Sequence, residues 1–159
     1  MDISLLNELG IIYISKYKDL KTGEEFFQRI LEIDNNNRRA LLNLGILYMC
    51  EYNNYIKAKE YLYKVYENYP EDIILLNSLA YLNLFVDINK SEEYLIKALD
   101  LEPNNNNTIT NLGNLYMEHI INHKLSEKCY LKVLELDPEN EIAYNNLMIL
   151  YSKKYKRED

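Results

Sequence analysis

Apolar residues recur along this chain at the three- and four-residue spacing of one helix face, not at the two-residue spacing of a strand. Between residues 37 and 71 this pattern occurs twice, and the polar segment EYNNY separates the two stretches. The pattern predicts two helices joined by a turn. Pro70, followed by Glu71 and Asp72, predicts the end of the second helix and the start of another. The apolar positions are Leu41, Leu44, Leu47 and Tyr48 in the first helix and Ala58, Leu62 and Val65 in the second.

The predicted helix pair is repeated along the chain, which two independent landmarks indicate. A small residue of the first helix recurs at intervals of 35, 35, 33 and 35 residues, and the end of each unit recurs at intervals of 35, 33 and 35. Equal intervals for separate landmarks predict a repeat architecture. The first landmark falls at Gly10, Gly45, Ala80, Gly113 and Met148, and the second at Asn35, Pro70, Pro103 and Pro138.

The unit length and landmark residues resemble the tetratricopeptide repeat, a helix–turn–helix unit of about 34 residues. That family places Leu-Gly and, three residues later, Tyr on the first helix, and this chain matches its pattern over residues 2–155. The resemblance implies an all-α fold, a right-handed α-solenoid of four antiparallel helix pairs closed by a capping helix. The implied single domain covers residues 1–159, with units 2–36, 37–71, 72–104 and 105–139 and a capping helix at 140–155. The Leu-Gly-Tyr positions are Leu9-Gly10-Tyr13, Leu44-Gly45-Tyr48 and Leu112-Gly113-Tyr116.

Glycine inside a predicted helix needs a packing reason, because it costs about 1 kcal/mol relative to alanine there. We expect Gly45 and Gly113 to let a helix of the same or the next pair approach closely. We expect Tyr48, three residues after Gly45, to fill the adjacent space and to place its hydroxyl at the rim. The third unit carries Ala80 in the glycine position, so its packing is expected to differ.

The charge balance narrows the classes of partner. The 159 residues carry 18 basic and 25 acidic side chains, a formal charge of −7, and much of the acid lies at predicted helix starts, where it favours the helix dipole. Because phosphate binding requires a basic surface, we expect no nucleic-acid partner. No apolar run approaches the roughly 20 residues that span a bilayer, so no membrane insertion is expected. Asp2 and Glu8 interrupt the N-terminal apolar run, which argues against a signal peptide and favours a cytoplasmic protein.

Residues that could perform chemistry are few. His119 and His123 have the spacing of a metal-ligand pair on one helix, but the repeat register places a turn between them. Single glycines inside helices form no phosphate loop, and two histidines in one turn form no catalytic triad. Cys50 and Cys129 lack metal-site spacing and are predicted to be buried free thiols. We therefore predict no enzyme activity, no metal and no cofactor.

The resemblance implies that the first helices line a concave groove that binds a protein or peptide. Many of the implied groove positions carry asparagine, whose carboxamide can donate to and accept from the backbone of an extended peptide. Asparagine is also abundant in the turns of this chain, so a background bias remains the alternative. The predicted groove residues are Asn7, Arg39, Asn43, Ile46, Asn77, Ser78, Tyr81, Phe85, Asn107, Asn111, Asn114, Asn145 and Asn146.

A more specific family mechanism, the clamp that holds a chain-terminal carboxylate, does not fit these positions. Arg39 and Asn43 could begin such a clamp, but the corresponding Ser78, Asn107 and Asn111 bring no positive charge. The sequence therefore predicts a polar groove without a carboxylate clamp.

Together these features predict a non-catalytic adaptor that binds a partner polypeptide in its concave groove. Two alternatives remain open: a scaffold that assembles with copies of itself or within a larger complex, or a regulatory domain of a larger enzyme. The expected oligomeric state is a monomer or a weak homo-oligomer. The side chains considered for self-assembly on the convex side are Tyr61, Tyr63 and Tyr66.

Overall fold

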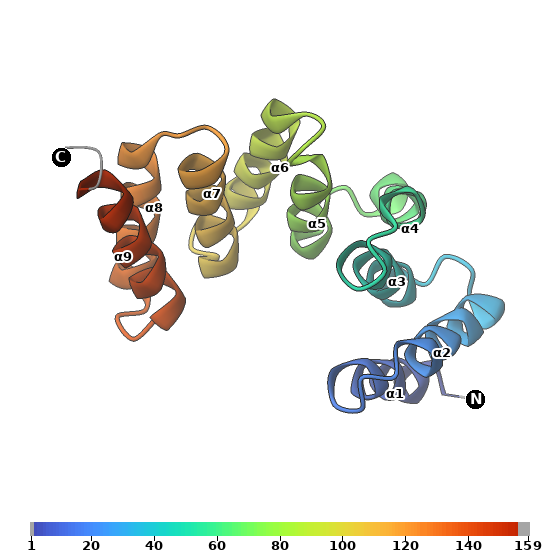
Figure 1. The fold of residues 1–159 in the computed structure, drawn as a ribbon. Coiled ribbons are helices and arrows are strands. Elements are labelled where there is room, and N and C mark those ends of the chain that lie inside the picture. The colour runs from blue at the N-terminus through green and yellow to red at the C-terminus, as the bar shows by residue number, and fades with distance from the viewer. Residues whose placement is uncertain (1, 156–159) are drawn as a thin grey trace. The chain divides into compact units, whose positions relative to one another are not determined.

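The computed structural model describes residues 2–155, which form nine α-helices and no strand (Figure 1). The predicted all-α fold is confirmed. Short turns join the helices. The odd-numbered helices are the first helices of the repeat units, and the even-numbered helices are the second. The helices are α1 (Ile3–Ser15), α2 (Leu20–Ile33), α3 (Arg38–Cys50), α4 (Tyr55–Asn68), α5 (Ile73–Asn83), α6 (Ile88–Leu101), α7 (Asn106–Glu118), α8 (His123–Leu136) and α9 (Glu141–Tyr155).

The chain divides into two compact units. Unit 1 is Met1–Leu82 and contains α1 to α4 with nearly all of α5, whereas unit 2 is Asn83–Asp159 and contains α6 to α9. The description as a single domain with the repeat bounds given above stays a prediction.

The glycines mark where two helices of one pair meet. A Cβ added at Gly45 would lie 2.6 Å from the Leu62 side chain of α4, and one at Gly113 would lie 2.7 Å from the Tyr130 ring of α8. Real Cβ atoms essentially never show such short contacts. The predicted packing role of glycine is confirmed, and the close neighbour is the second helix of the same pair.

Several asparagines in the turns are helix N-caps, among them Asn37, Asn54, Asn105 and Asn122. Asn37 Oδ1 accepts from the backbone N–H of Ala40 (3.2 Å) at the start of α3, and Asn105 caps α7 in the same way. Asparagine is among the best N-cap residues because its oxygen satisfies an otherwise unpaired amide. The carboxylate three residues earlier orients each cap, since Asn37 donates to Asp34 (3.0 Å) and Asn105 donates to Glu102 (2.8 Å).

A tyrosine–glutamate hydrogen bond joins neighbouring helix pairs three times. The Tyr116 hydroxyl of α7 donates to Glu92 of α6 (2.6 Å), and Tyr151 of α9 donates to Glu127 of α8 (2.7 Å). In unit 1, Tyr48 makes the same bond to Glu24. The pKa of the Tyr116 hydroxyl is raised, first by burial and then by the Glu92 carboxylate. The tyrosine three residues after the glycine position thus connects its first helix to the second helix of the preceding pair.

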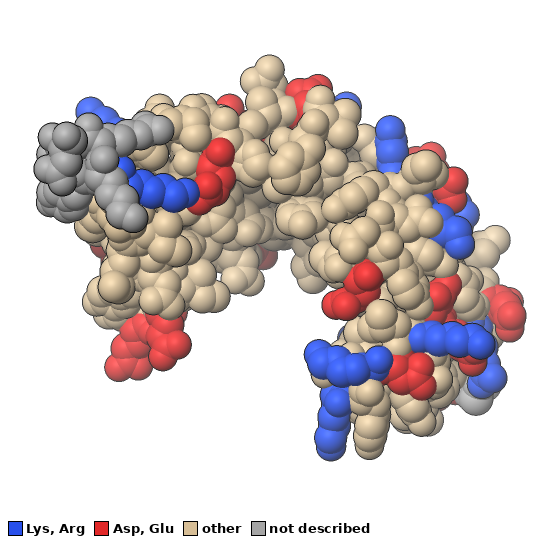
Figure 2. Space-filling view, viewed as in Figure 1, with Lys and Arg blue, Asp and Glu red and all other residues tan. Residues whose placement is uncertain are grey.

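Acidic and basic side chains are interspersed over α1 and α2 on the face drawn in Figure 2. Within residues 2–155, no helix combines the length and the apolar character that crossing a membrane requires. The same residues contain no group of three or more His, Cys, Asp or Glu arranged to hold a metal ion. Both cysteines are free, but neither is fully buried as predicted. Cys50 is exposed, because it lies at the last position of α3, and Cys129 is half-buried.

Candidate functional site

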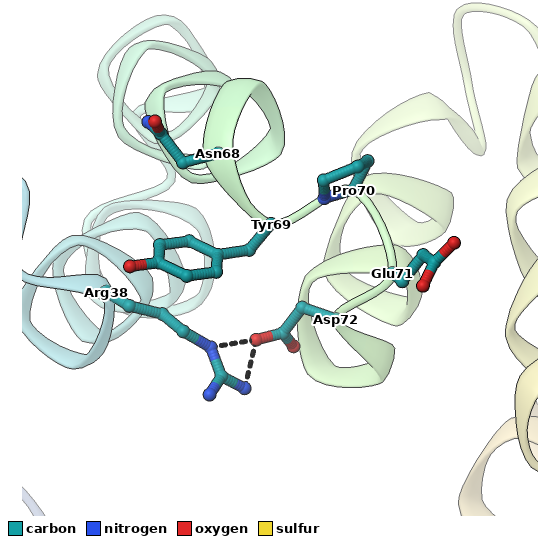
Figure 3. Close-up of a pocket in the computed structure, with 6 residues that line it drawn as sticks. All are labelled: Arg38, Asn68, Tyr69, Pro70, Glu71 and Asp72. Carbon is teal, nitrogen blue, oxygen red and sulfur yellow. Dashed lines mark hydrogen bonds and ion pairs between the residues drawn. The ribbon is translucent and has the colours of Figure 1, made fainter.

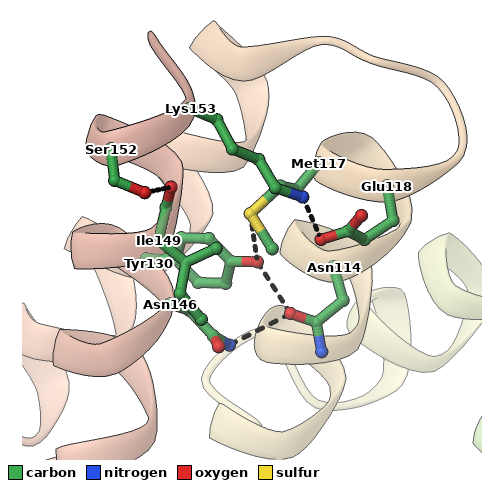
Figure 4. A network of polar contacts seen from close by, with 8 residues as sticks. All are labelled: Asn114, Met117, Glu118, Tyr130, Asn146, Ile149, Ser152 and Lys153. Carbon is green, nitrogen blue, oxygen red and sulfur yellow. Dashed lines mark hydrogen bonds and ion pairs between the residues drawn. The ribbon is translucent and has the colours of Figure 1, made fainter. Parts of the chain in front are cut away.

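The first helices of unit 2, α7 and α9, meet through a pair of asparagines (Figure 4). Asn146 Nδ2 donates to Asn114 Oδ1 at 3.0 Å, and the Tyr130 hydroxyl of α8 donates to the same oxygen at 2.7 Å. Asn114 Nδ2 and Asn146 Oδ1 then have no hydrogen-bond partner in the part of the chain that the structure describes. Both residues are half-buried, so one donor and one acceptor are held at the surface between two helices.

Tyr130 fixes the orientation of this asparagine pair. The Tyr130 side chain is fully buried beneath α7, and its hydroxyl lies 3.9 Å from Met117 Sδ. Burial raises the pKa of Tyr130 to about 12, so the hydroxyl stays protonated at physiological pH and remains a donor. Because Asn114 Oδ1 accepts from the Tyr130 hydroxyl, the NH2 group is the part of the Asn114 carboxamide that faces outwards.

Exposed amide and apolar side chains surround the asparagine pair. Ile142 and Ile149 of α9 are 62% and 44% exposed. At the C-terminal end of α7, Lys153 of α9 forms an ion pair with Glu118 (2.7 Å), so this end of the face carries compensated charge. The predicted site residues exposed on α7 and α9 are Asn107, Asn111 and Asn145.

Unit 1 also has an asparagine pair, in which one partner, Asn7, is buried and the other, Asn43, is half-buried. Asn43 Nδ2 of α3 donates to Asn7 Oδ1 of α1 at 2.9 Å. Asn7 is only 1% exposed, and its Nδ2 has no hydrogen-bond partner among the described residues. Beside the pair, the exposed side chains of Arg39 and Glu8 approach to 3.4 Å. A bound chain could reach Asn43 and Arg39 but not Asn7.

The predicted site residues on α5 are less available. Asn77 Nδ2 donates to the carbonyl of Ile73, and the buried Ser78 hydroxyl donates to the carbonyl of Ile74, both at 2.8 Å within α5 itself. Tyr81 is 46% exposed.

Two further predicted residues differ in where the structure places them. Ile46 is half-buried on α3. Phe85 is 80% exposed and lies in the turn that follows α5, not on a first helix, because α5 ends at Asn83. α5 has 11 residues where α3 has 13, so the helix stops before the position that the repeat register assigned to Phe85.

A pocket of about 410 Å³ lies beside the turn between α4 and α5 (Figure 3). Arg38 of α3 forms an ion pair with the buried carboxylate of Asp72, whose Oδ1 accepts from the N–H of Leu75 (3.0 Å) at the start of α5. The Arg38 guanidinium also lies 5.9 Å from the Tyr69 ring. This ion pair could not be predicted from local sequence patterns, since its partners are 34 residues apart. Both charged groups are therefore paired within the protein, and this ion pair connects α3 to the start of α5.

Comparisons with known proteins agree with this architecture. Residues 107–140 match the profile of the tetratricopeptide repeat. No curated protein matches the sequence. The crystal structure of MamA is 22% identical with a TM-score of 0.71, covering 98% of this chain and 84% of that one. A thermophilic TPR protein from Thermus thermophilus is 17% identical with a TM-score of 0.78, covering 96% and 81%. The first TPR of Spaghetti (RPAP3) bound to the HSP90 peptide SRMEEVD is 20% identical with a TM-score of 0.65, covering 77% and 96%.

The chain is therefore an all-α helical-repeat protein. Residues 107–140 are similar to the tetratricopeptide repeat, and the fold of the described residues is similar to that of solved tetratricopeptide-repeat proteins. Helical-repeat proteins of this kind present extended surfaces that bind other proteins.

Proposed function

We propose that this chain is a non-catalytic module that binds an extended segment of a partner polypeptide on the exposed faces of its first helices. The observation that carries the proposal is the asparagine pair of α7 and α9, which presents one donor and one acceptor that have no partner among residues 2–155. The structure of the first TPR of Spaghetti (RPAP3) bound to a peptide supports the proposal, because its fold is similar and its ligand is a peptide.

The chemistry of the pair fits a peptide group. The N–H group of Asn114 can donate to a backbone carbonyl, and Asn146 Oδ1 can accept from a backbone N–H. A helical partner uses its own N–H and carbonyl groups internally, so the pair favours an extended segment. Recognition of the backbone leaves side-chain selectivity to the neighbouring apolar residues Ile142 and Ile149, which offer exposed surface for aliphatic side chains.

The charges near the asparagine pairs favour recognition of a peptide backbone over recognition of a chain-terminal carboxylate. Lys153 is already paired with Glu118, and in unit 1 Arg39 lies beside Glu8. Neither cation is uncompensated, so a terminal carboxylate would compete with an internal one for each. We therefore propose a partner segment that is internal to its own chain and has little net charge.

Selection from a library of random unstructured peptides tests this function. The best peptide would be labelled, and its affinity for the protein would be measured by fluorescence anisotropy. In Asn146→Leu, which keeps the branched shape of the side chain but removes the acceptor, we expect affinity to fall about tenfold, the effect of one or two hydrogen bonds. The same peptide with the contacted amide replaced by an ester should bind the wild-type protein more weakly by a similar factor.

The matched control is Lys132→Ala on α8, an exposed residue outside the α7 and α9 face. This variant should bind as the wild type does, and circular dichroism should show unchanged helix content in both variants. Equal affinity of Asn146→Leu and wild type, or no selectable peptide, would contradict the proposal.

A further inference from the structure

The helix pairs α1/α2, α3/α4 and α7/α8, each of which lies within one unit, share a packing pattern. The first helix presents a glycine, and a Cβ added there would lie 2.6 or 2.7 Å from a large side chain of the second helix. The partners are Gly10 with Phe27, Gly45 with Leu62 and Gly113 with Tyr130. Four residues before each glycine, the first helix carries an aliphatic residue that the pair buries, namely Leu6 (1% exposed), Leu41 (2%) and Ile109 (4%).

Helix α9 has different residues at the same two positions. Tyr144 occupies the position of Leu6, Leu41 and Ile109, and Met148 occupies the position of the glycines. Both side chains are exposed, Tyr144 by 52% and Met148 by 68%, so none of the described helices covers them. The end of a helical-repeat protein normally carries a polar outer face. The capping role that the sequence predicts for α9 therefore does not account for these two side chains.

A carboxylate continues the same line of side chains. Glu141 precedes Tyr144 by three residues and Met148 by seven, so the three lie along one flank of α9, and we call them the α9 stripe. Glu141 is exposed and forms no ion pair with a described residue. At about 100° per residue, Tyr144 lies about 200° around the helix from Ile142, and Met148 lies about 200° from Asn146. The α9 stripe is therefore on the opposite flank from the asparagine pair, and its role is independent of the proposed function.

We propose that the α9 stripe binds an amphipathic helix of a partner protein, in the position that the second helix occupies in the three pairs. The repeat itself indicates the kind of element that covers this flank, because a helix covers it in each of those pairs. Binding of an amphipathic helix through its apolar face is a recurring mode of recognition. The formal charge of −7 opposes a second copy of this chain as the occupant.

The residues of the α9 stripe define what the partner helix must carry. Glycine on the first helix is matched by a large residue on the second, so Met148 requires a small residue, such as alanine, at that point of the partner. In an antiparallel pair the C-terminal end of the partner helix lies beside the start of α9. A basic residue in its last turn would face Glu141 there and would also favour the helix dipole. The expected partner helix is apolar on one face, with a small residue at its centre and a basic residue at its C-terminal end.

A helical peptide built from α4 tests this proposal. The peptide has the sequence of Tyr55–Asn68, held helical by a hydrocarbon staple on its polar side, with Leu62→Ala to match Met148 and Glu67→Lys to face Glu141. Fluorescence anisotropy should show saturable binding of the labelled peptide to the full chain. The same peptide with Leu62 retained should bind about tenfold more weakly, because it places two large side chains in one contact. Met148→Gly in the protein should reverse this preference, since it restores the glycine against which Leu62 packs in α3/α4.

Three further variants separate the two flanks of α9. Met148→Glu should abolish binding of the helical peptide, and Glu141→Gln should weaken it several-fold. The matched control is Ile142→Glu, because Ile142 is 62% exposed on the other flank and its substitution should leave binding of the helical peptide unchanged. Circular dichroism should show the wild-type helix content in all three variants.

No binding of the Leu62→Ala peptide, or equal weakening by Met148→Glu and Ile142→Glu, would overturn the proposal. Sedimentation velocity provides a second arm. Self-association of the protein that Met148→Glu abolishes would assign the α9 stripe to a second copy and would equally overturn the proposed partner helix. Met148→Glu should bind the extended peptide of the proposed function as the wild type does, so the two proposals can fail separately.

Discussion

The two compact units use the same residue type in different ways. In unit 1 Asn43 donates to Asn7, which is only 1% exposed and whose amide nitrogen has no partner in the described residues. In unit 2 the pair of Asn114 and Asn146 is half-buried, and Tyr130 fixes it from below. An asparagine–asparagine bond between first helices therefore includes a buried partner in unit 1, whereas both partners are half-buried in unit 2.

The units also differ in the side chains at the N-terminal ends of successive first helices. Arg38 and the buried Asp72 form an ion pair in unit 1. The residues at the equivalent repeat positions of unit 2 are Asn106 and Asn140, and Asn106 Oδ1 is buried without a hydrogen-bond partner among the described residues. Unit 1 thus depends on a charge pair where unit 2 has neutral amides.

The largest expected effect is the loss of this ion pair. Arg38→Met should lower the free energy of unfolding by about 2–3 kcal/mol, because it leaves the Asp72 carboxylate buried and unpaired. The effect should stay below that of a fully buried pair, since Arg38 is 46% exposed. Urea denaturation followed by circular dichroism measures it. Asn106→Met in unit 2 should change stability little, and a comparable loss there would remove the contrast between the units.

The asparagine pairs should respond to leucine with opposite signs. Asn114→Leu should cost about 1–3 kcal/mol, because the buried Tyr130 hydroxyl loses its acceptor. Asn7→Leu together with Asn43→Leu should be neutral or stabilising by up to about 1 kcal/mol, since it removes a buried unpaired amide and replaces both partners by apolar groups. Thermal and urea unfolding of the two variants compare them directly. Destabilisation of both would mean that apolar groups cannot replace the unit 1 pair.

The tyrosine–glutamate bonds are the feature that both units share. Tyr48→Phe and Tyr116→Phe should each lower stability by about 1 kcal/mol, the net value of one hydrogen bond in a partly buried site. Hydrogen exchange of the surrounding helices would report the loss for each unit separately. A loss confined to one unit would show that the tyrosine–glutamate bond does not contribute equally to the stability of both units.

The smallest expected effect is an alkaline dependence of stability. The pKa of Tyr116 is raised, and burial raises the pKa of Tyr130 and of Tyr52 to about 12, whereas an unfolded tyrosine has a pKa of about 10. Above pH 10 the unfolded chain releases protons that the folded chain keeps, so stability should fall as the pH rises towards 12. Tyr116→Phe should make this decline shallower in urea titrations at a series of pH values. An unchanged slope would indicate that Tyr116 ionises equally in both states.

Much of the architecture could be predicted because repeats confine it to local patterns. Gly45 and Gly113 predicted close helix contacts, and the apolar stripe of α4 predicted its buried residues. The structure decided that each close neighbour belongs to the same pair. Capping was available in the same letters, since Asn37 and Asn105 precede apolar stripes and follow an acidic residue by three positions. The capping role of these asparagines was not predicted, because asparagine is abundant throughout the chain.

The sequence by itself determined the helix pairs, their register and the glycines at which the two helices of a pair meet, because these depend on contacts between residues close along the chain. Only the tertiary structure decided which asparagines are buried and which are half-buried. The bonds from Asn43 to Asn7 and from Asn146 to Asn114 span 36 and 32 residues and connect different positions of the repeat. Burial and partner choice at such positions follow from how neighbouring pairs pack, and a periodic pattern of letters does not encode that arrangement.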